Sequence, residues 1–282
     1  MILVTGATGK IGRELVPLLL AKGAPVRALT RDPAKARFDP EVDVVRGDLD
    51  DPATLPAALK GVDAVFVLTS GHGGDGPAQE ANLAAAATAA GAARLVKIST
   101  TGVHFGGTDP ISSGHRVSEE IIRNAGPHWT ILQPGAFMDN RFAWLKSVRE
   151  EGVAYVTEGE PDSAMIHCRD IAAVAAEVLT TDGHHGATYQ LTGGAALSAE
   201  QQVAVLAEAV GRPLRLAVES EQVTRARFAS WGWTGPAIDG MFKMRRSSPE
   251  AHRTVFDTVT TLLGRPALTF TDWSRQHAHL FR

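Results

Sequence analysis

Short apolar runs alternate with segments of helical periodicity along the first half of the chain. The runs are rich in β-branched residues and occupy residues 2–5, 26–29, 43–45, 64–68, 95–99 and 130–133. Between them, apolar positions recur at helical spacing in residues 12–23, 52–61, 77–91 and 118–126, and several of these segments end at glycine, a common residue at helix ends. This alternation predicts an α/β fold in which βαβ units build a parallel sheet.

The pattern changes in the second half. Residues 164–181 predict a strand that leads into a helix, residues 187–194 predict another strand, and residues 198–211 predict a helix that begins at Ser198. The rest is mostly helical in pattern, and its aromatic residues suit a ligand cavity and an ordinary core equally well. We predict a larger domain over residues 1–155 and a smaller one over residues 156–282, with part of residues 160–192 returning to the sheet.

Composition argues against several classes of function. The 282 residues are 44% hydrophobic and carry a net charge of −3, without the basic surface of a nucleic-acid binder. The single cysteine, Cys168, can form no intramolecular disulfide or thiol cluster, so we predict no bound metal and a reducing, cytoplasmic location. No apolar run is long enough to cross a bilayer, and the first residues lead us to expect no secretory leader. We expect a bacterial monomer or homodimer that acts on a small molecule.

A glycine-rich loop follows the first predicted strand and opens the first predicted helix. In "VTGATGKIG", Gly6, Gly9 and Gly12 recur at three-residue intervals. Glycine suits such a loop because the chain must turn tightly, approach a pyrophosphate closely and pack a helix against a strand. Backbone N–H groups at the helix start then meet the phosphate charge. The loop predicts a dinucleotide site, with a structural turn as the alternative. Its expected cofactor contacts are Gly6, Thr8, Gly9, Lys10, Ile11 and Gly12.

The end of the second predicted strand bears on cofactor choice. Arg31 lies about 20 residues beyond the glycine loop, where an acidic residue would bind the ribose hydroxyls of NAD and an arginine would pair with the 2′-phosphate of NADP. Lys35 and Arg37 follow in the same basic segment, although Asp32 lies directly after Arg31. We predict that NADP(H) is preferred and that NAD(H) is an alternative. An exposed basic loop without this role is the structural alternative.

Two further strand ends are expected to meet the cofactor. Asp48 and Leu49 follow the third predicted strand, where a carboxylate would bind the adenine amine and an apolar side chain would contact the ring. Leu68, Thr69 and Ser70 end the fourth strand, at the carboxyl edge of the sheet. Taken alone, each stretch more often marks a simple strand end.

With these residues, the chain resembles the NmrA-like group of atypical short-chain dehydrogenases/reductases, which includes NAD(P)H-dependent quinone reductase-like proteins. The similarity covers nearly the whole chain and is carried by "VTGATGKIG", "RGDLDD", "LVKISTTG", "HRVSEEIIRNAGPHWTILQPGAFMDN", "IHCRDIAAVAAEVL" and "TFTDWSRQHAHLF". It implies a doubly wound Rossmann-type domain that binds NAD(P), followed by a smaller substrate-binding domain. In "QPGAFMDN" it implies nicotinamide contacts from Pro134, Gly135, Ala136 and Phe137.

The catalytic pair of many short-chain dehydrogenases is missing. In those enzymes a Tyr-x-x-x-Lys pair supplies a proton to a carbonyl, but the matching segment here carries His115 and Glu119. Histidine can exchange protons near neutrality, so His115 is a candidate catalytic residue, with shaping of the pocket as its alternative. Ser99 and Thr100, just beyond the fifth strand, are candidates for binding a substrate carbonyl or the nicotinamide amide. Lys97, inside that strand, is expected to be structural.

Two classes of function agree with these features. The first is an NADPH-dependent oxidoreductase that passes a hydride to a conjugated acceptor such as a quinone or enone, whose delocalised charge needs less help from a protein acid. The alternative is a non-catalytic sensor that binds NADP(H) and signals to a protein partner. The missing pair favours the sensor, whereas Phe228, Trp231, Trp233 and Met241 suggest a domain that encloses a small molecule.

Overall fold

The computed structural model describes residues 1–69, 76–247 and 249–282. These residues form two compact units. Unit 1 comprises residues 1–104, 112–134 and 168–190, and unit 2 comprises residues 105–111, 135–167 and 191–282. Residues 135–155 therefore pack in unit 2, although the periodicity placed them in the first domain. Residues 168–190 return to unit 1 and bring the last strand of its sheet with them.

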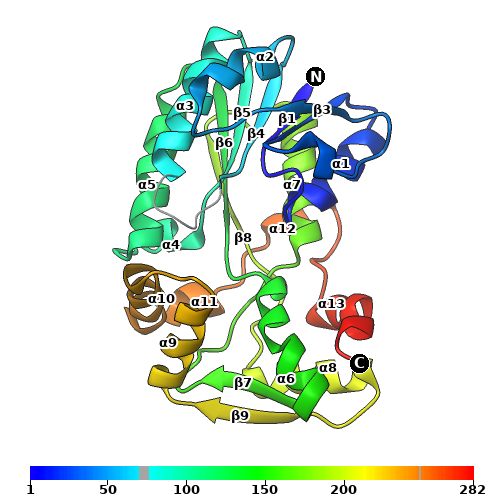
Figure 1. Cartoon of the computed structure of the whole chain (residues 1–282), viewed down its shortest axis with the longest axis vertical. Coiled ribbons are helices and arrows are strands. Elements are labelled where there is room, and N and C mark those ends of the chain that lie inside the picture. The colour runs from blue at the N-terminus through cyan, green and yellow to red at the C-terminus, as the bar shows by residue number, and fades with distance from the viewer. Residues whose placement is uncertain (70–75, 248) are drawn as a thin grey trace. The chain divides into compact units, whose positions relative to one another are not determined.

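Unit 1 is built on a seven-stranded sheet with the strand order β3-β2-β1-β4-β5-β6-β8 (Figure 1). Neighbouring strands from β3 to β6 pair in parallel, as the apolar runs predicted. The strands are β1 (Ile2–Val4), β2 (Val26–Thr30), β3 (Asp43–Arg46), β4 (Ala64–Val67), β5 (Arg94–Ile98), β6 (His128–Pro134) and β8 (Ala187–Leu191). The predicted α/β fold is confirmed.

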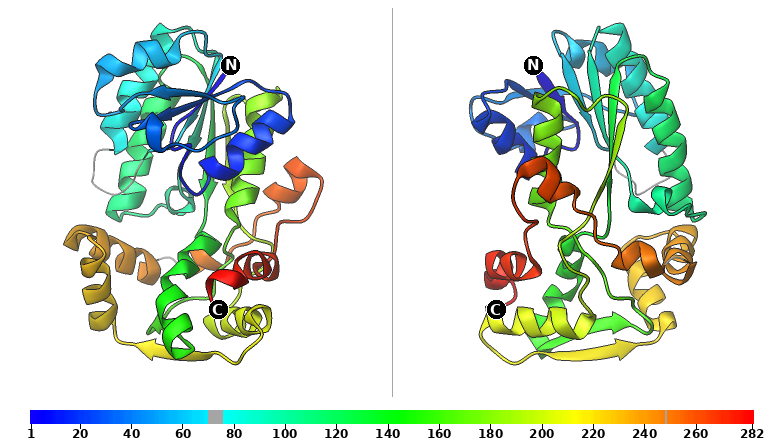
Figure 2. Two further views of the ribbon diagram at one scale, coloured as in Figure 1. Left: turned by 45° about the vertical axis from the view of Figure 1, so that its right-hand side comes forward. Right: turned by 180° about the vertical axis from the view of Figure 1, so that it is seen from behind.

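Helices cover both faces of this sheet, which is why its central strands are apolar on both sides. Figures 1 and 2 show α3 and α5 on one face and α1 and α7 on the other. Lys22, directly after α1, forms an ion pair with Glu177 of α7 at 2.8 Å. The helices of this part of the fold are α1 (Gly12–Ala21), α2 (Leu55–Leu59), α3 (Gly76–Ala89), α4 (Thr101–His104), α5 (Pro110–Arg123) and α7 (Cys168–Thr180), with short 3-10 turns at Pro33–Lys35 and Pro52–Thr54.

Unit 2 combines helices with a small parallel sheet of β7 (Val153–Thr157) and β9 (Arg215–Glu219). Its core gathers around Trp273, which is fully buried, with Phe270 and Phe281. The helices are α6 (Leu145–Glu151), α8 (Ala199–Val210), α9 (Glu221–Ser230), α10 (Gly235–Ser247), α11 (Pro249–Arg253), α12 (Thr258–Leu263) and α13 (Phe270–His277), with 3-10 segments at Met138–Trp144 and Ala278–Leu280.

Several sequence predictions for the second half need correction. The small sheet was not predicted, because its strands pair across a long stretch of chain and neither shows a clear alternation. Residues 164–167 do not form the predicted strand and make only isolated bridges, such as that between Ile166 and Phe137. Ser198 caps α8 as predicted, and its capping-box partner is Gln201. Among the described residues, no helix is long and apolar enough to span a membrane, and no cluster of His, Cys, Asp and Glu is arranged to hold a metal.

Candidate active site

The glycine-rich loop joins β1 to α1 and leaves no room for side chains at two of its glycines. Gly6 has a φ of 60°, in the left-handed region that favours glycine. A Cβ atom on Gly12 would lie 2.3 Å from the carbonyl oxygen of Gly6 and 2.5 Å from Cα of Ala7. The loop therefore lies against the start of α1, and its backbone is open to a ligand there.

Thr5, at the start of this loop, forms hydrogen bonds with the end of the neighbouring strand β4. Its hydroxyl accepts a hydrogen bond from the backbone N–H of Leu68 at 2.8 Å and lies within donating distance of the carbonyl oxygens of Phe66 and Leu68, at 3.0 and 2.9 Å. Thr5 is fully buried. It holds the carboxyl ends of β1 and β4 together, so the loop has a rigid base.

A cavity of about 760 Å³ lies at the carboxyl ends of β1 to β4 in unit 1. Its volume suits a small-molecule or cofactor site. The predicted cofactor contacts that line it are Gly6, Thr8, Gly9, Arg31, Asp48, Leu49 and Leu68. These residues come from four separate stretches of the chain. They meet at the carboxyl edge of the sheet, where doubly wound folds bind dinucleotides.

The other predicted contacts from the loop and strand β4 lie outside this lining. Lys10 is exposed, while Ile11 is buried in the core, and Gly12 packs against the loop. Thr69 donates a hydrogen bond from its hydroxyl to Glu80 at 2.9 Å. Ser70 lies outside the described residues.

The predicted nicotinamide loop begins where β6 ends. Pro134 is the last residue of β6 and belongs to unit 1, whereas Gly135, Ala136 and Phe137 belong to unit 2. In unit 2, the N–H of Gly135 donates to the carbonyl of Leu191 at 2.9 Å, and the carbonyl of Ala136 accepts from Ile166 at 2.8 Å. These bonds fix the backbone of the loop, and its role in nicotinamide binding stays a prediction.

Four basic side chains line the cavity beside the end of β2. Arg31, Lys35 and Arg37 were expected there, and Arg13 of α1 joins them. Asp32 also lines the cavity, but its carboxylate forms an ion pair with Lys35 at 3.0 Å, which offsets its charge. The sequence reading missed Arg13, although an arginine directly after the third glycine of the loop could have indicated it.

At the end of β3, the cavity wall combines carboxylates with apolar groups. Asp48 accepts a hydrogen bond from the N–H of Asp50 at 3.1 Å, and Leu49 packs partly on the core of unit 1. Gln79 of α3 donates to the carboxylate of Asp50 at 2.9 Å and lines the cavity with Phe38. Neither Gln79 nor Phe38 was predicted, because no local motif marks them.

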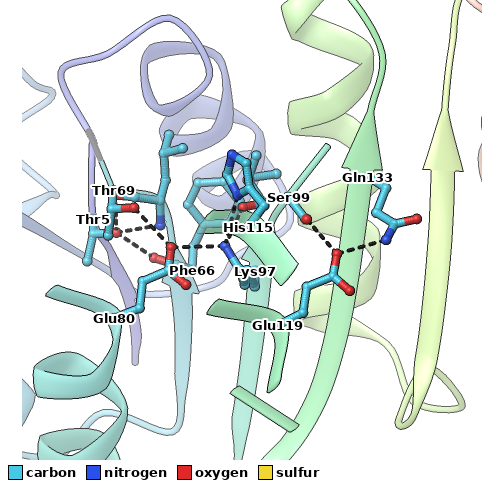
Figure 3. A network of polar contacts seen from close by, with 11 residues as sticks. Thr5, Phe66, Thr69, Glu80, Lys97, Ser99, His115, Glu119 and Gln133 are labelled. Atoms are coloured by element: carbon cyan, nitrogen blue, oxygen red, sulfur yellow. Dashed lines mark hydrogen bonds and ion pairs between the residues drawn. The ribbon is translucent and has the colours of Figure 1, made fainter. Parts of the chain in front are cut away.

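A buried ionic network lies between β5 and the helices α3 and α5 (Figure 3). Lys97, at 0% exposure, forms an ion pair with Glu80, at 1%, over 2.9 Å. Its ammonium group also donates to the carbonyl of Ile98 at 2.8 Å and lies 3.5 Å from Nδ1 of His115. Burial lowers the pKa of Lys97 below its ordinary value, and attraction by Glu80 and Glu119 opposes that shift.

Ser99 belongs to a second buried network, centred on the carboxylate of Glu119. Its hydroxyl donates a hydrogen bond to Oε1 of Glu119, and the side-chain amide of Gln133 donates to the same oxygen at 2.8 Å (Figure 3). Arg123 forms an ion pair with Oε2 at 2.8 Å. Since the proton of Ser99 is engaged by Glu119, the hydroxyl offers other groups only its lone pairs.

His115 and Thr100 lie close to these networks. α5 begins at Pro110, so His115 lies inside this helix with its side chain half-buried. Thr100 follows β5, and its hydroxyl accepts from the N–H of Gly102 at 3.3 Å. His115 and Ser99 thus lie beside Lys97 at the end of β5 (Figure 3), and Thr100 follows Ser99 in the chain.

Unit 2 contains a separate cavity of about 650 Å³, lined mainly by apolar side chains such as Met165, Leu197 and Phe270. The buried hydroxyl of Ser163 lies in its wall and has no hydrogen-bond partner among the described residues. The aromatic residues highlighted in the sequence do not line it. Instead, Phe228 stacks on Trp233 with ring centroids 5.1 Å apart and contacts the cluster that contains Met241, while Trp231 is 49% exposed.

A charged cluster in unit 2 is also largely buried. Arg141 forms an ion pair with Glu160 at 2.6 Å, and Arg245 lies 3.8 Å from the other carboxylate oxygen. Burial by itself raises the pKa of Glu160, but attraction by Arg141 and Arg245 outweighs burial, so the pKa falls below its ordinary value. Arg141 also donates to Gln202 at 2.6 Å.

Comparison with known proteins identifies the family to which this chain belongs. The sequence model of the family described as NAD(P)H-binding matches residues 6–182, which contain the three glycines of the loop and every residue that lines the cavity in unit 1 except Thr5. The chain belongs to this NAD(P)H-binding family. The resemblance to NmrA-like atypical short-chain dehydrogenases/reductases, inferred from the motifs, is confirmed.

Relatives of this NAD(P)H-binding protein match it over its whole length. It is 40% identical to a (4-alkanoyl-5-oxo-2,5-dihydrofuran-3-yl)methyl phosphate reductase of Streptomyces griseus, with 100% of this chain and 99% of the relative covered. It is also 40% identical to an NAD(P)H azoreductase of Xenophilus azovorans, with the same coverage. An NADPH-dependent quinone oxidoreductase of Escherichia coli, solved with NADPH, is 28% identical with a TM-score of 0.85 over 100% of both chains. The chain is an NAD(P)H-dependent oxidoreductase.

Proposed function

We propose that this protein uses NADPH to reduce a conjugated carbonyl acceptor, such as a quinone or an enone, without a Tyr-x-x-x-Lys pair. When bound, the dinucleotide supplies the hydride. The glycine loop, the cavity in unit 1 and its basic side chains fit its phosphates and adenosine half. The chain's own groups bind and orient the reactants and stabilise the charge that develops on the acceptor.

The observation that carries this proposal is the state of the groups at the end of β5. Glu119 stands where the family pair would have its lysine, and its carboxylate accepts from Ser99 and Gln133 and pairs with Arg123. The hydroxyl proton of Ser99 is therefore engaged, and no tyrosine replaces it as an acid in the matching segment. Simple ketones, which need a strong donor at one oxygen, suit this site poorly. Conjugated acceptors spread the negative charge and suit it better.

The named reactants of the relatives support this class of acceptor. The dihydrofuranone ring of the Streptomyces griseus substrate has a carbon–carbon double bond conjugated to two carbonyl groups, and the Escherichia coli relative reduces quinones. Both kinds of molecule can accept a hydride at a carbon that is conjugated to a carbonyl group, so the negative charge is delocalised onto the carbonyl oxygen. The sensor alternative has no comparable support, because the relatives at 40% identity are reductases.

Cofactor preference follows from the basic side chains at the end of β2. Arg31, with Arg13, Lys35 and Arg37 nearby, provides positive charge for a 2′-phosphate, and the pairing of Asp32 with Lys35 weakens the feature that would favour NAD. We therefore infer that NADPH is the preferred cofactor. His115 and Thr100 are the side chains we assign to the acceptor, and Pro134 to Phe137 to the nicotinamide.

The cavity of about 650 Å³ in unit 2 is lined mainly by apolar side chains, and such a lining suits an aromatic or alicyclic ring. We also infer a cytoplasmic protein, since its single cysteine, Cys168, is buried and reduced. We expect a monomer or homodimer, which light scattering on the purified protein distinguishes.

Stopped-flow oxidation of NADPH by the purified protein tests the proposed reaction. The acceptors are a panel of quinones, enones and simple ketones, and the NADPH is deuterated separately on each face of the nicotinamide. We expect quinones or enones to take the label from one face only, with ketones inert. Gly9→Asp is the control, because a carboxylate in the loop repels the phosphates and abolishes the rate. Tight NADPH binding with no acceptor reduced would contradict the proposal.

A further inference from the structure

The buried pair of Lys97 and Glu80 is unexpected in the interior of this sheet. The other residues at the end of β5, Val96 and Ile98, are buried and apolar. Moving two charges out of water opposes folding, and apolar side chains of similar size often serve packing equally well. Packing alone therefore gives no reason for a lysine at this position, and its neighbours indicate another role.

The ammonium group of Lys97 has three polar neighbours. Two are hydrogen bonds, to Oε1 of Glu80 at 2.9 Å and to the carbonyl oxygen of Ile98 at 2.8 Å. The third is the approach to Nδ1 of His115 at 3.5 Å (Figure 3). With two hydrogens engaged by oxygens, the third is directed at the ring nitrogen.

Lys97 and Glu80 form a close ion pair at 2.9 Å. The Oε1 atom of Glu80 accepts hydrogen bonds from both Lys97 and Thr69. Burial lowers the pKa of Lys97, and the negative charges of Glu80 and Glu119 oppose that shift and favour the ammonium form. A charged Lys97 has no lone pair, so it can only donate to Nδ1 of His115.

We propose that Lys97 is a positioning residue that holds the His115 ring in the tautomer with its proton on Nε2. An Nδ1 atom that faces an ammonium group must present its lone pair, and the neutral ring then carries its hydrogen on the other nitrogen. Glu80 acts one step further away, because it fixes the ammonium group that faces the ring. The second contact of a histidine commonly sets its tautomer in this manner.

This inference rests on the proposed function and specifies what His115 contributes to it. A neutral imidazole donates a hydrogen bond through Nε2–H to the acceptor oxygen but does not give up that proton. The acceptor gains a hydride at carbon from NADPH, the electron pair of its double bond moves to oxygen, and that anion takes its proton from water. The products are NADP⁺, the reduced acceptor and hydroxide, so atoms and charge balance.

Nitrogen NMR of the full chain with bound NADP⁺ tests the tautomer directly. Histidines are labelled with ¹⁵N, long-range ¹H–¹⁵N spectra are recorded at about pH 8, where unperturbed imidazoles are neutral, and His115→Gln identifies the signals of the ring. We expect the Nε2–H form almost exclusively in the wild-type protein. The Nδ1–H form would overturn the proposal, because it would mean that Lys97 is a neutral amine that accepts from the ring.

The matched variant replaces both members of the pair, as K97M/E80M. Removing only Lys97 would leave a buried, uncompensated carboxylate and endanger folding, whereas replacing the pair with apolar side chains is often tolerated. We expect the His115 signals to shift to a mixture of both tautomers, and kcat with a quinone to fall about tenfold, the size of one lost hydrogen bond. NADPH affinity should stay unchanged. An unchanged tautomer in this variant would overturn the proposal.

Lys22→Met is the control, because it removes a lysine ion pair on the surface of the same unit. It should change neither the tautomer nor kcat. The two proposals fail separately: if no acceptor is reduced, the proposed function is contradicted, while the NMR spectra still decide the role of Lys97. If a quinone is reduced and His115 keeps its tautomer in K97M/E80M, only the role of Lys97 is contradicted.

Discussion

At the scale of single residues, the phosphate loop depends on missing side chains. Gly12 touches the backbone of Gly6 and Ala7 so closely that a methyl group has no space. Gly114, inside α5, has nothing within 4 Å of an added Cβ. Substituting each glycine with alanine therefore separates two effects on stability: steric crowding in the loop at Gly12, and the low helix propensity of glycine at Gly114.

Gly12→Ala should destabilise the fold by about 1–3 kcal/mol or more, as expected for an overpacked site, and should weaken NADPH binding because the loop must shift. Gly114→Ala should stabilise it by about 0.5–1 kcal/mol through helix propensity. Urea unfolding followed by circular dichroism measures both changes, and isothermal calorimetry measures NADPH binding. Equal stabilities for the two variants would contradict the close packing of the loop.

Arg31 is the residue on which the NADPH preference depends most directly. Arg31→Ala should weaken NADPH binding about tenfold to a hundredfold, since a charge-assisted hydrogen bond contributes roughly 1.5–3 kcal/mol. NADH has no 2′-phosphate, so its affinity should change little. Calorimetric titration with both cofactors makes the comparison, with Arg149→Ala, an exposed arginine of unit 2, as the control. Similar losses for NADH and NADPH would refute the assignment.

At the scale of elements, Glu119 ties α5 to the sheet. Its carboxylate accepts hydrogen bonds from Ser99 at the end of β5 and from Gln133 of β6. The side-chain oxygen of Gln133 accepts a hydrogen bond in turn from Gln190 of β8 at 2.8 Å. Three neighbouring strands are thus linked through two buried side chains, Glu119 and Gln133. The next residue, Glu120, points to solvent from the same helix.

Glu119→Ala should lower the free energy of unfolding by about 3 kcal/mol, because hydrogen bonds to a charged group are lost and buried donors are left unpaired. Glu120→Ala should change it by no more than about 0.5 kcal/mol. Chemical unfolding of both variants by urea tests this difference. A small effect of Glu119→Ala would show that water replaces the carboxylate and that the network does not tie the helix to the strands.

At the scale of the whole molecule, stability toward acid depends on buried charges such as Glu160. The folded pKa of Glu160 lies below its ordinary value of 4.5. A carboxylate of this kind stabilises the fold fully above its unfolded pKa, and that contribution is lost as the pH falls through the folded pKa. The sign is therefore a loss of stability below about pH 4.5.

Glu160→Gln should destabilise the protein at neutral pH by roughly 3–5 kcal/mol, because Arg141 and Arg245 lose their carboxylate. As the pH falls through the folded pKa of Glu160, the difference from the wild type should shrink, since Glu160 then becomes protonated in the wild type as well. Unfolding curves from about pH 3 to 7 check this, with the exposed Glu150→Gln as the control. A difference that stays constant with pH would contradict the ion-pair explanation.

Local patterns were sufficient for the sheet of unit 1 and for part of the cofactor cavity. A buried parallel strand needs a continuous apolar run, and a loop that meets phosphate needs glycine, so both leave short and regular signals. Arg31, Asp48 and Leu68 were found because each follows a strand whose end faces the cavity. Arg13, Phe38 and Gln79 carry no such signal and were missed.

Other features depend on contacts between distant parts of the chain. Whether Lys97 is a surface charge or the buried partner of Glu80 depends on which helix covers β5, and the pairing of β7 with β9 joins residues about sixty positions apart. Residues near one another in sequence are constrained by backbone geometry, so periodicity reports them. Partners brought together by packing are constrained only by the finished fold, because many alternative pairings are compatible with the same local pattern. Strand and helix order could therefore be read from the amino-acid sequence, whereas the network around His115 emerged only from the packing of α3 and α5 on the sheet.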